Sequence, residues 1–290
     1  MTLRQSPPPI RHVRPPQFRA PIGSCDCHVH VVGPQTIYPL APQAAVAMED
    51  STLADLRAVH ATLGISRALI VGSGLHAFNY QHVLHALGQD RTRYRGVVIL
   101  PFDITDLEIS LLDQAGVVGA RFYPGIAEID ERMLARVFER GWSAHFLIMD
   151  TSQLDRWVPI INAYPGRFVI EHAGLPDPRE GVNGRHAAQI LTFLDTDRCW
   201  IKLSPRFTKQ RDLPYEDTLP FIHRLVSYRP DRLLYGSDYP HPSHWDPMPN
   251  EADLLDLMLL WAPDSRDQQR IMVENPEELF GFPTADESQK

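Results

Sequence analysis

Two histidines and an aspartate alternate near the start of the chain, in the run Asp26-Cys27-His28-Val29-His30. An extended strand points alternate side chains to opposite faces, so Asp26, His28 and His30 are predicted to share one face. Burying two imidazoles beside a carboxylate is costly unless they bind a metal, a substrate oxygen or one another. The run therefore indicates either a catalytic pocket or a hydrogen-bonded structural cluster.

These side chains need a scaffold, and short apolar runs recur along the chain between longer segments of helical periodicity. That alternation is typical of repeated strand–helix units around a parallel sheet. The candidate strands are residues 25–32, 66–73, 94–101, 117–123, 144–150, 168–172, 199–203 and 233–238. Amphipathic segments between them include residues 53–63, 81–87, 131–140, 185–194 and 218–228. Eight such units favour a closed α/β fold, a TIM-like (β/α)8 barrel.

The length of 290 residues suits one large core and leaves no comfortable room for a second full domain. Residues 1–22 are rich in proline and lack periodicity, which predicts an extended N-terminal arm. The barrel is expected over residues 23–284, with segment 252–279 supplying additional helices and a closing helix. Residues 285–290 are expected to form a C-terminal tail.

Composition narrows the classes of partner. The formal net charge is −8, from 28 basic and 36 acidic residues spread without a basic patch, so nucleic acid is not an expected partner. The three cysteines, Cys25, Cys27 and Cys199, suit a reducing compartment better than a disulfide framework. No apolar run resembles a signal peptide or reaches membrane-spanning length, so we expect a cytoplasmic protein with no membrane contact.

Later strands also end in residues that can do chemistry, namely His172 and Asp238. Because the carboxyl ends of all barrel strands open onto one face, these residues should converge with His28 and His30. The relevant runs are Phe168-Val169-Ile170-Glu171-His172-Ala173-Gly174, Leu234-Tyr235-Gly236-Ser237-Asp238-Tyr239-Pro240-His241, and Glu274-Asn275-Pro276 followed by Leu279-Phe280. In this order they resemble the amidohydrolase superfamily, and the last motif resembles its amidohydrolase-related branch.

The fifth strand is where zinc-dependent members of that superfamily commonly supply a further ligand, a histidine or a modified lysine. Here the strand ends in Phe146-Leu147-Ile148-Met149-Asp150, and His145 lies at its start, the wrong end for ligation. A thioether is a poor partner for zinc, and Asp150 is expected to cap the next helix. We therefore expect no obligatory metal and no other cofactor.

The branch with the same omission is that of the 2-pyrone-4,6-dicarboxylate lactonases, metal-independent hydrolases that this sequence resembles over nearly its whole length. The runs that carry this resemblance are Tyr38-Pro39-Leu40-Ala41-Pro42, Ile70-Val71-Gly72-Ser73 with His76, Gly119-Ala120-Arg121-Phe122, His172-Ala173-Gly174-Leu175-Pro176-Asp177, Lys202 followed by Arg206, and Gly236-Ser237-Asp238-Tyr239-Pro240-His241-Pro242.

The resemblance implies roles for the clustered residues. Asp238 would be the general base that takes a proton from water, and the hydroxide would attack a lactone carbonyl. His28, His30 and His172 would replace the metal by polarising that carbonyl and stabilising the oxyanion. Asp238 would then return its proton to the leaving oxygen, and Asp26 would orient His28 or His172.

A dicarboxylate substrate needs several fixed cations, for which the arginine fork is well suited. Arg121 and Arg206 are candidates, but Leu175 and Met149 stand where the lactonases have polar contacts, and residues 122–127 lack a second arginine. The pocket is therefore predicted to be less cationic. We expect a lactone or ester with one carboxylate or another anionic group, in preference to the pyrone dicarboxylate.

Each predicted substrate-binding residue has a structural alternative. Arg121 can form a salt bridge in the barrel mouth, and Arg206 can be a solvated charge. Ser73, His76 and His241 follow predicted strands and are candidates for the pocket wall, although turn serines and surface histidines are common.

Three hypotheses for the function follow. The preferred one is a metal-independent hydrolase of a small anionic lactone or ester. The second is a zinc-dependent amidohydrolase or a related decarboxylase, in which His28, His30, Asp238 and another group hold the ion. The third is a barrel that binds a metabolite or a protein without catalysis, and such a barrel would not need to keep His28, His30, His172 and Asp238 together.

Overall fold

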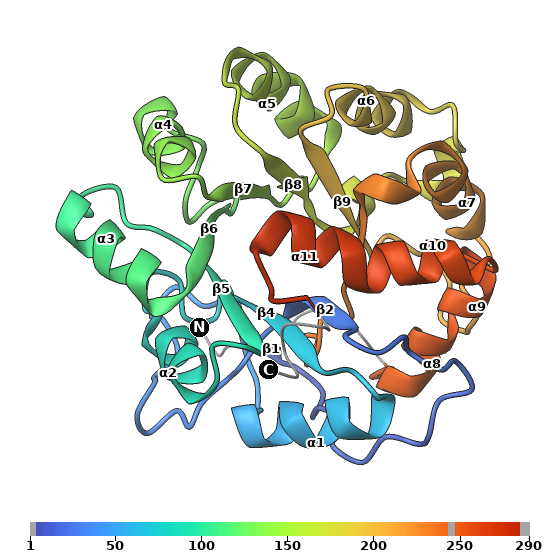
Figure 1. Ribbon diagram of the computed structural model, residues 1–290, viewed down its shortest axis with the longest axis horizontal. Helices are drawn as coiled ribbons and strands as arrows, with labels where there is room; N and C mark the ends of the chain where they lie inside the picture. The colour runs from blue at the N-terminus through green and yellow to red at the C-terminus, as the bar shows by residue number, and fades with distance from the viewer. Residues whose placement is uncertain (1–3, 243–246, 285–290) are drawn as a thin grey trace.

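A ring of parallel strands surrounds the centre of the molecule, and helices cover its outside (Figure 1). The computed structural model describes residues 4–242 and 247–284. Within them the large sheet has eight strands, each parallel to its neighbour and arranged in chain order. They are β2 Cys25–Val29, β4 Arg67–Val71, β5 Tyr94–Val98, β6 Val117–Phe122, β7 Ser143–Phe146, β8 Phe168–Ile170, β9 Cys199–Leu203 and β10 Leu233–Tyr235. The predicted (β/α)8 barrel is confirmed.

The first and last strands of the barrel meet through residues at and just beyond their ends. The backbone N–H of Asp238 donates to the carbonyl oxygen of His28 at 2.9 Å, and that of His30 donates to the carbonyl oxygen of Tyr239 at 2.7 Å. Gly236 permits this approach, because a Cβ added there would lie 2.8 Å from the Cβ of His28. Closing the barrel therefore places His28 beside Asp238.

Four helices of the outer ring begin at a side chain that caps their first turn, namely Thr52, Thr105, Asp130 and Asp150. Thr52 accepts the backbone N–H of Asp55, Thr105 accepts that of Glu108, and such bonds satisfy donors that the first turn leaves unpaired. The helices are α1 Leu53–Leu63, α2 Gln81–Gln89, α3 Asp106–Ala115, α4 Glu131–Glu139, α5 Thr151–Ala163, α6 Arg185–Leu194 and α7 Leu219–Tyr228 (Figure 1). Their apolar faces pack on the outside of the strands in one large core.

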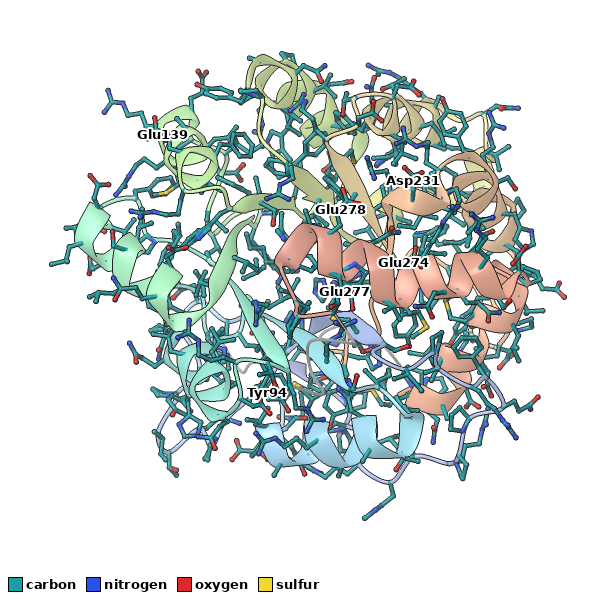
Figure 2. The ribbon with its side chains drawn as sticks, in the orientation of Figure 1. Tyr94, Glu139, Asp231, Glu274, Glu277 and Glu278 are labelled. Atoms are coloured by element: carbon teal, nitrogen blue, oxygen red, sulfur yellow. The ribbon has the colours of Figure 1, made fainter. Side chains whose placement is uncertain are left out.

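The amino-terminal end of the barrel is closed by the C-terminal segment. This segment contains α8 Glu251–Asp256, α9 Met258–Trp261, α10 Ser265–Gln269, the π-helical turn η4 Arg270–Glu274 and α11 Asn275–Phe280. Figure 1 shows α11 lying across the strands, and Phe280 and Phe282 belong to one buried cluster with Cys25, the first residue of β2. Glu277, labelled in Figure 2, accepts a hydrogen bond from Arg67 at 2.8 Å. With this end filled, the opposite end of the barrel is left for a polar site.

The N-terminal residues run extended along the surface. A two-residue strand, β1 Arg4–Gln5, pairs with β3 Val46–Ala47. Further on, Arg14 makes an ion pair with Asp256 at 2.6 Å. This contact fastens the arm to α8. The predicted tail, residues 285–290, lies outside the described residues.

Two of the predicted strands, 168–172 and 233–238, end before the candidate catalytic residues His172 and Asp238. After β8, residues Glu171–Gly174 form a 3-10 turn, η1, in which His172 has a φ of 52°. After β10, Asp238 has a φ of 72°. A left-handed φ is unfavourable for residues other than glycine, so the surrounding structure must hold both residues there. Two further 3-10 turns are η2 Pro178–Glu180 and η3 Pro230–Arg232.

Helix length also bears on membrane contact. Among the described residues, no helix is long and apolar enough to cross a bilayer.

Candidate active site

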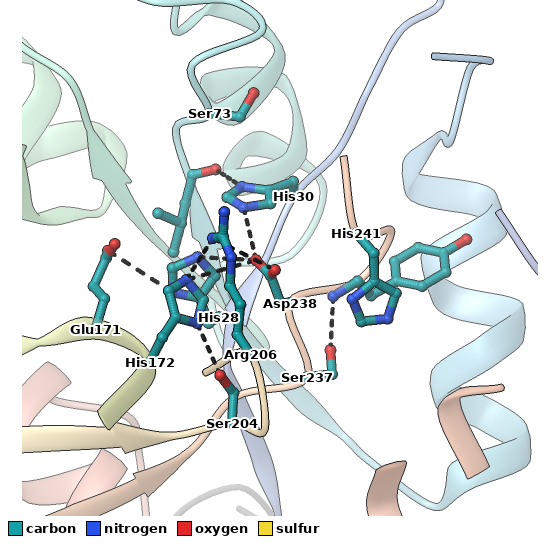
Figure 3. A network of polar contacts seen from close by, with 12 residues as sticks. His28, His30, Ser73, Glu171, His172, Ser204, Arg206, Ser237, Asp238 and His241 are labelled. Atoms are coloured by element: carbon teal, nitrogen blue, oxygen red, sulfur yellow. Dashed lines mark hydrogen bonds and ion pairs between the residues drawn. The ribbon is translucent and has the colours of Figure 1, made fainter. Parts of the chain in front are cut away.

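Asp238 lies at the centre of a buried polar cluster at the carboxyl ends of the strands (Figure 3). Its Oδ1 lies 3.4 Å from Nε2 of His30, 3.6 Å from Nε2 of His28 and 3.8 Å from Nε2 of His172. On the other side, Arg206 Nη1 lies 3.7 Å from Oδ2. The three histidines predicted to carry the chemistry thus converge around the carboxylate of the fourth such residue, Asp238.

The prediction that Asp26 shares this pocket is wrong. The pairing of β2 with β4 shifts register between Asp26 and Val29, so simple alternation of side chains breaks down there. Asp26 Oδ2 instead lies 3.6 Å from Nε2 of His60 on α1. Its Oδ1 accepts the backbone N–H groups of His28 at 3.1 Å and Ser237 at 3.0 Å. Asp26 therefore fixes the backbone that carries His28, from outside the pocket.

Hydrogen-bond partners assign the protons of two of the histidines. Nδ1 of His30 lies 2.7 Å from the carbonyl oxygen of Val71, an acceptor, so this nitrogen carries a proton. For His172, Nε2 lies 3.0 Å from Nη1 of Arg206, which can only donate, so Nε2 accepts. The remaining nitrogen of His172 then donates to the hydroxyl of Ser204 at 2.9 Å.

His28 has the opposite arrangement. Its Nδ1 lies 3.1 Å from Nζ of Lys202, a buried residue of β9. An ammonium group donates only, so Nδ1 accepts and the proton of the neutral imidazole is on Nε2. That N–H faces Asp238. Glu171 Oε1 is the nearby acceptor, 3.8 Å from His28 Nδ1 and 3.9 Å from Lys202 Nζ.

Burial and charge set the ionisation of this cluster. Burial opposes ionisation of Asp238, but the charge of Arg206, followed by His172 and His30, outweighs it and holds the pKa of Asp238 well below its usual value. Burial holds the pKa values of His28 and His172 well below the usual value for histidine. At neutral pH the cluster therefore holds an ionised Asp238 and a neutral His28 and His172.

Lys202 keeps its charge in the same surroundings. Burial lowers the pKa of Lys202 to about 8, against the opposing effect of Glu171. The ammonium form therefore predominates at pH 7.

Arg121 is one of the two arginines predicted to bind an anionic group of the substrate. In the structure it forms a salt bridge, which is the structural alternative given for it. Its Nη2 lies 2.7 Å from Oε2 of Glu171, and both side chains are buried. Arg206 differs, since it lies against His172 and Asp238 in the centre of the cluster. The structure therefore places Arg206, and not Arg121, beside His172 and Asp238.

The remaining predicted pocket residues lie around the cluster. Ser73 Oγ is 3.4 Å from Nδ1 of His76, and burial lowers the pKa of His76 to about 4. His241 pairs with Glu251, Nε2 to Oε1 at 2.6 Å. Burial opposes protonation of His241, but Glu251 outweighs it and raises the pKa. This histidine is held by α8.

A cavity opens next to these residues. Its volume is about 250 Å³, and Gly74, Tyr123 and Pro242 are among the residues that line it. Gly74 follows Ser73, Pro242 follows His241, and Tyr123 stacks against the guanidinium of Arg121. The cavity is thus at the mouth of the barrel, beside the cluster, although Asp238 and the three histidines around it are not among the residues that line it.

The fifth strand of the barrel behaves as the sequence predicted. Asp150 caps α5 by accepting the backbone N–H of Gln153 at 2.9 Å. His145 is buried at the opposite end of the barrel, where its ring stacks on Phe280. Neither residue reaches the cluster around Asp238.

Sequence reasoning assigned no role to Glu171 and Lys202, although both lie in the cluster. The available signal was a single charged residue in each of two apolar strand runs, Phe168-Val169-Ile170-Glu171 and Cys199-Trp200-Ile201-Lys202. A charge in a strand buried on both faces requires a partner. Ser204 and Glu251 were also missed, and nothing in their local sequence distinguishes them.

The spacing of ligand atoms in the cluster suits a metal ion. Two groups of atoms lie within 4.8 Å of one another, and they belong to His28, His30 and Asp238, and to His28, Glu171 and His172. The first group contains the three residues named as zinc ligands in the zinc-dependent hypothesis.

The hydrogen-bond partners do not suit zinc. A zinc-bound histidine normally donates its other N–H to an acceptor. His30 meets this condition with a carbonyl oxygen, but His28 has the ammonium of Lys202 against its other nitrogen. Arg206 already donates to Nε2 of His172. The donor set as arranged here does not fit a resident zinc ion.

The fold and the cluster define a barrel hydrolase of the amidohydrolase type. The chain belongs to the Amidohydrolase family, whose profile matches residues 25–282. It is 32% identical over 284 residues to the 2-pyrone-4,6-dicarboxylate hydrolase of Comamonas testosteroni, covering 91% of this chain and 92% of that one. It is also 32% identical over 282 residues to the 4-sulfomuconolactone hydrolase of Rhizobium radiobacter, covering 92% and 93%.

Solved structures agree on the fold. A crystal structure of an Agrobacterium tumefaciens protein superposes with a TM-score of 0.81 at 27% identity, covering 93% of this chain and all of the other. A Burkholderia multivorans amidohydrolase with bound zinc superposes with a TM-score of 0.65 at 17% identity, covering 90% and 99%.

Proposed function

We propose that this chain hydrolyses a small anionic lactone, or a related ester, without a metal ion. One observation carries the proposal. Oδ1 of Asp238 and Nε2 of His28 are buried 3.6 Å apart, and neither has a hydrogen-bond partner among the described residues. Buried polar atoms are normally paired. An acceptor and an N–H donor that face each other in this way match the water and the carbonyl oxygen of a hydrolysis.

The reaction follows from these two atoms. Asp238 accepts a proton from water, and the resulting hydroxide attacks the lactone carbonyl carbon. The N–H on Nε2 of His28 donates to the carbonyl oxygen as negative charge develops there. The ring C–O bond then breaks, and the proton on Asp238 passes to the leaving oxygen. The product is the open-chain hydroxy acid or its enol, and Asp238 is again ionised.

The other histidines have distinct parts in this mechanism. His30 already donates through Nδ1, so Nε2 of its neutral ring, which faces Asp238, is an acceptor. His172 accepts from Arg206 and so holds the guanidinium beside Asp238. The polarising role assigned to three histidines is thus carried by the N–H of His28, and His172 contributes by holding Arg206.

The substrate class rests on Arg206 and on the relatives. A guanidinium pairs well with a carboxylate or a sulfonate, and the side chain of Arg206 is 8% exposed at the cluster. The relatives are named for anionic lactones, a pyrone dicarboxylate and a sulfomuconolactone. With Arg121 paired to Glu171, a substrate with one anionic group beside the ring ester fits this pocket better than a dicarboxylate.

The test is a screen of purified protein against lactones with one and with two carboxylates, before and after exhaustive chelation. Asp238→Asn is expected to lower kcat/KM by about 10²- to 10⁴-fold, the range for a lost general base. Asp150→Asn is the matched control, because this residue caps α5 away from the cluster and asparagine also caps helices. We expect it to retain activity.

Three outcomes would contradict the proposal. Unchanged activity in Asp238→Asn would show that Asp238 is not the general base. Activity lost on chelation and restored only by zinc would favour the zinc-dependent alternative. Binding of a lactone without turnover would favour the non-catalytic barrel.

A further inference from the structure

Lys202 is the buried group of the cluster to which neither the sequence nor the proposed reaction gives a role. It lies in β9, whose other residues are apolar, and its side chain has no exposed surface. Burying an ammonium group is costly, so a lysine at this position needs a compensating function or partner. Its nearest polar contact is Nδ1 of His28, at 3.1 Å.

We propose that Lys202 is a positioning residue that fixes His28 as the tautomer protonated on Nε2 and thereby keeps divalent metal out of the barrel. The use of this tautomer as a donor toward the substrate carbonyl rests on the proposed function. The exclusion of metal does not, because it depends only on the lone pairs of the cluster and holds for any substrate.

The hydrogen bond between Lys202 and His28 has only one possible direction. An ammonium group has three N–H donors and no acceptor, so Nδ1 of His28 must supply the lone pair. The neutral ring then carries its proton on Nε2, which faces Asp238. A metal ion needs a lone pair on that nitrogen. The contact with Lys202 therefore makes Nε2 of His28 a donor toward the substrate carbonyl and prevents the same nitrogen from binding a metal ion.

The charge of the cluster also opposes a metal ion. Glu171 is the carboxylate near Lys202, but its other oxygen is paired with Arg121 at 2.7 Å. With Arg206 and Asp238 included, three cations face two carboxylates in a largely buried space. A divalent ion would add two charges to a site that already has an excess of one, at a cost that low polarity amplifies.

Removing the ammonium group would change both the charge balance of the cluster and the tautomer of His28. In Lys202→Met the charges balance, and Glu171 Oε1, 3.8 Å from His28 Nδ1, becomes the remaining polar partner. Nδ1 can then donate to this carboxylate, and Nε2 gains a lone pair. His28, His30 and Asp238 would form a carboxylate-supported metal triad of the kind that zinc enzymes use.

The experiment measures metal content. Wild type, Lys202→Met and the matched control Lys209→Met, at an exposed lysine, are incubated with zinc, freed of unbound ion and analysed by mass spectrometry of the metal. We expect about one zinc per chain in Lys202→Met and far less in the other two proteins. Adding His30→Gln to Lys202→Met should abolish uptake, which locates the ion. Equal uptake by wild type and Lys202→Met would overturn the proposal, as would no uptake by folded Lys202→Met.

A second measurement needs only wild-type protein, in case Lys202→Met does not fold. Long-range ¹H–¹⁵N spectra of histidine-labelled protein report which ring nitrogen carries the proton, and His28→Gln assigns the signal. We expect the Nε2–H form in wild type and, where the variant folds, the Nδ1–H form in Lys202→Met. An Nδ1–H signal for His28 in wild type would overturn the proposal. Loss of lactone turnover in Lys202→Met without these changes would instead bear on the proposed function.

Discussion

Glu171 and Arg121 form a buried ion pair in which one carboxylate oxygen accepts two hydrogen bonds, from Nη2 at 2.7 Å and from Nε at 3.0 Å. The third nitrogen of the guanidinium, Nη1, donates to the carbonyl oxygen of Gly72 at 2.8 Å. Arg121 is therefore engaged on all sides by the protein. Its part is to hold Glu171 near Lys202 and His28.

Breaking this pair should cost stability before it affects substrate binding. We expect Arg121→Met to lower the free energy of unfolding by about 3–5 kcal/mol, because it leaves the Glu171 carboxylate with less compensation. Adding Glu171→Leu should recover much of the loss. Urea denaturation of the single and double variants measures both values. Unchanged stability, with a raised KM for anionic substrates alone, would restore the substrate-binding role.

Removing the Arg206 guanidinium should discriminate between substrates by charge. We expect Arg206→Gln to lower kcat/KM for a lactone carboxylate about 10- to 100-fold more than for its neutral methyl ester, because a charge-assisted contact is lost only with the anion. Steady-state kinetics with the two substrates gives the ratio. An equal fall in kcat/KM for the two substrates would indicate that Arg206 instead holds His172 and Asp238 in position.

The glycine at the barrel seam should not tolerate a methyl group. In Gly236→Ala the new Cβ would lie 2.8 Å from the Cβ of His28, so the strands must separate, at about 1–3 kcal/mol. Activity should fall as well, since Asp238 and His28 move apart. Gly88→Ala is the control: a Cβ there meets no atom within 4 Å, and alanine favours the α2 helix. Calorimetric melting should show opposite shifts for the two variants.

Stability should fall as the pH is lowered below about 7. Burial holds the pKa values of His28, His82, His145 and His172 well below the usual value. Below about pH 6.5 the unfolded chain therefore binds protons that the folded chain does not. The stability from each group is complete above that pH and is lost toward lower pH, at up to about 1.4 kcal/mol per pH unit.

The measurement is a series of urea titrations between about pH 7.5 and 5. His145→Gln is an informative variant, because His145 stacks on Phe280 at the end of the barrel away from Asp238. It should reduce the slope by up to about 1.4 kcal/mol per pH unit. A wild-type stability that does not change over this range would contradict the expectation.

Much of the fold could be predicted from the sequence, because individual strands and helices are encoded by local patterns of residues. The predicted strand 199–203 matches β9, and the predicted helix 53–63 matches α1, where Thr52 and Asp55 form the cap. The alternation of strand and helix then determined the barrel, and the barrel determined that His28, His172 and Asp238 would meet.

Strand periodicity failed at Asp26, where a shift of register turned the side chain toward His60. It also failed at His172 and Asp238, which take left-handed backbone conformations outside regular strands. A register shift depends on the neighbouring strand, and strain depends on the packing that holds it, so neither is written in a local pattern.

By itself the sequence determined the barrel, the identity of the histidines and aspartate at its mouth, and the lack of a ligand on the fifth strand. Only the tertiary structure decided what those groups are able to do. The proton on His28 is set by Lys202, 174 positions away, and the charge of Arg121 is matched by Glu171. Tautomers and ion pairs depend on which donor lies within about 3 Å of which acceptor, and folding alone creates those distances.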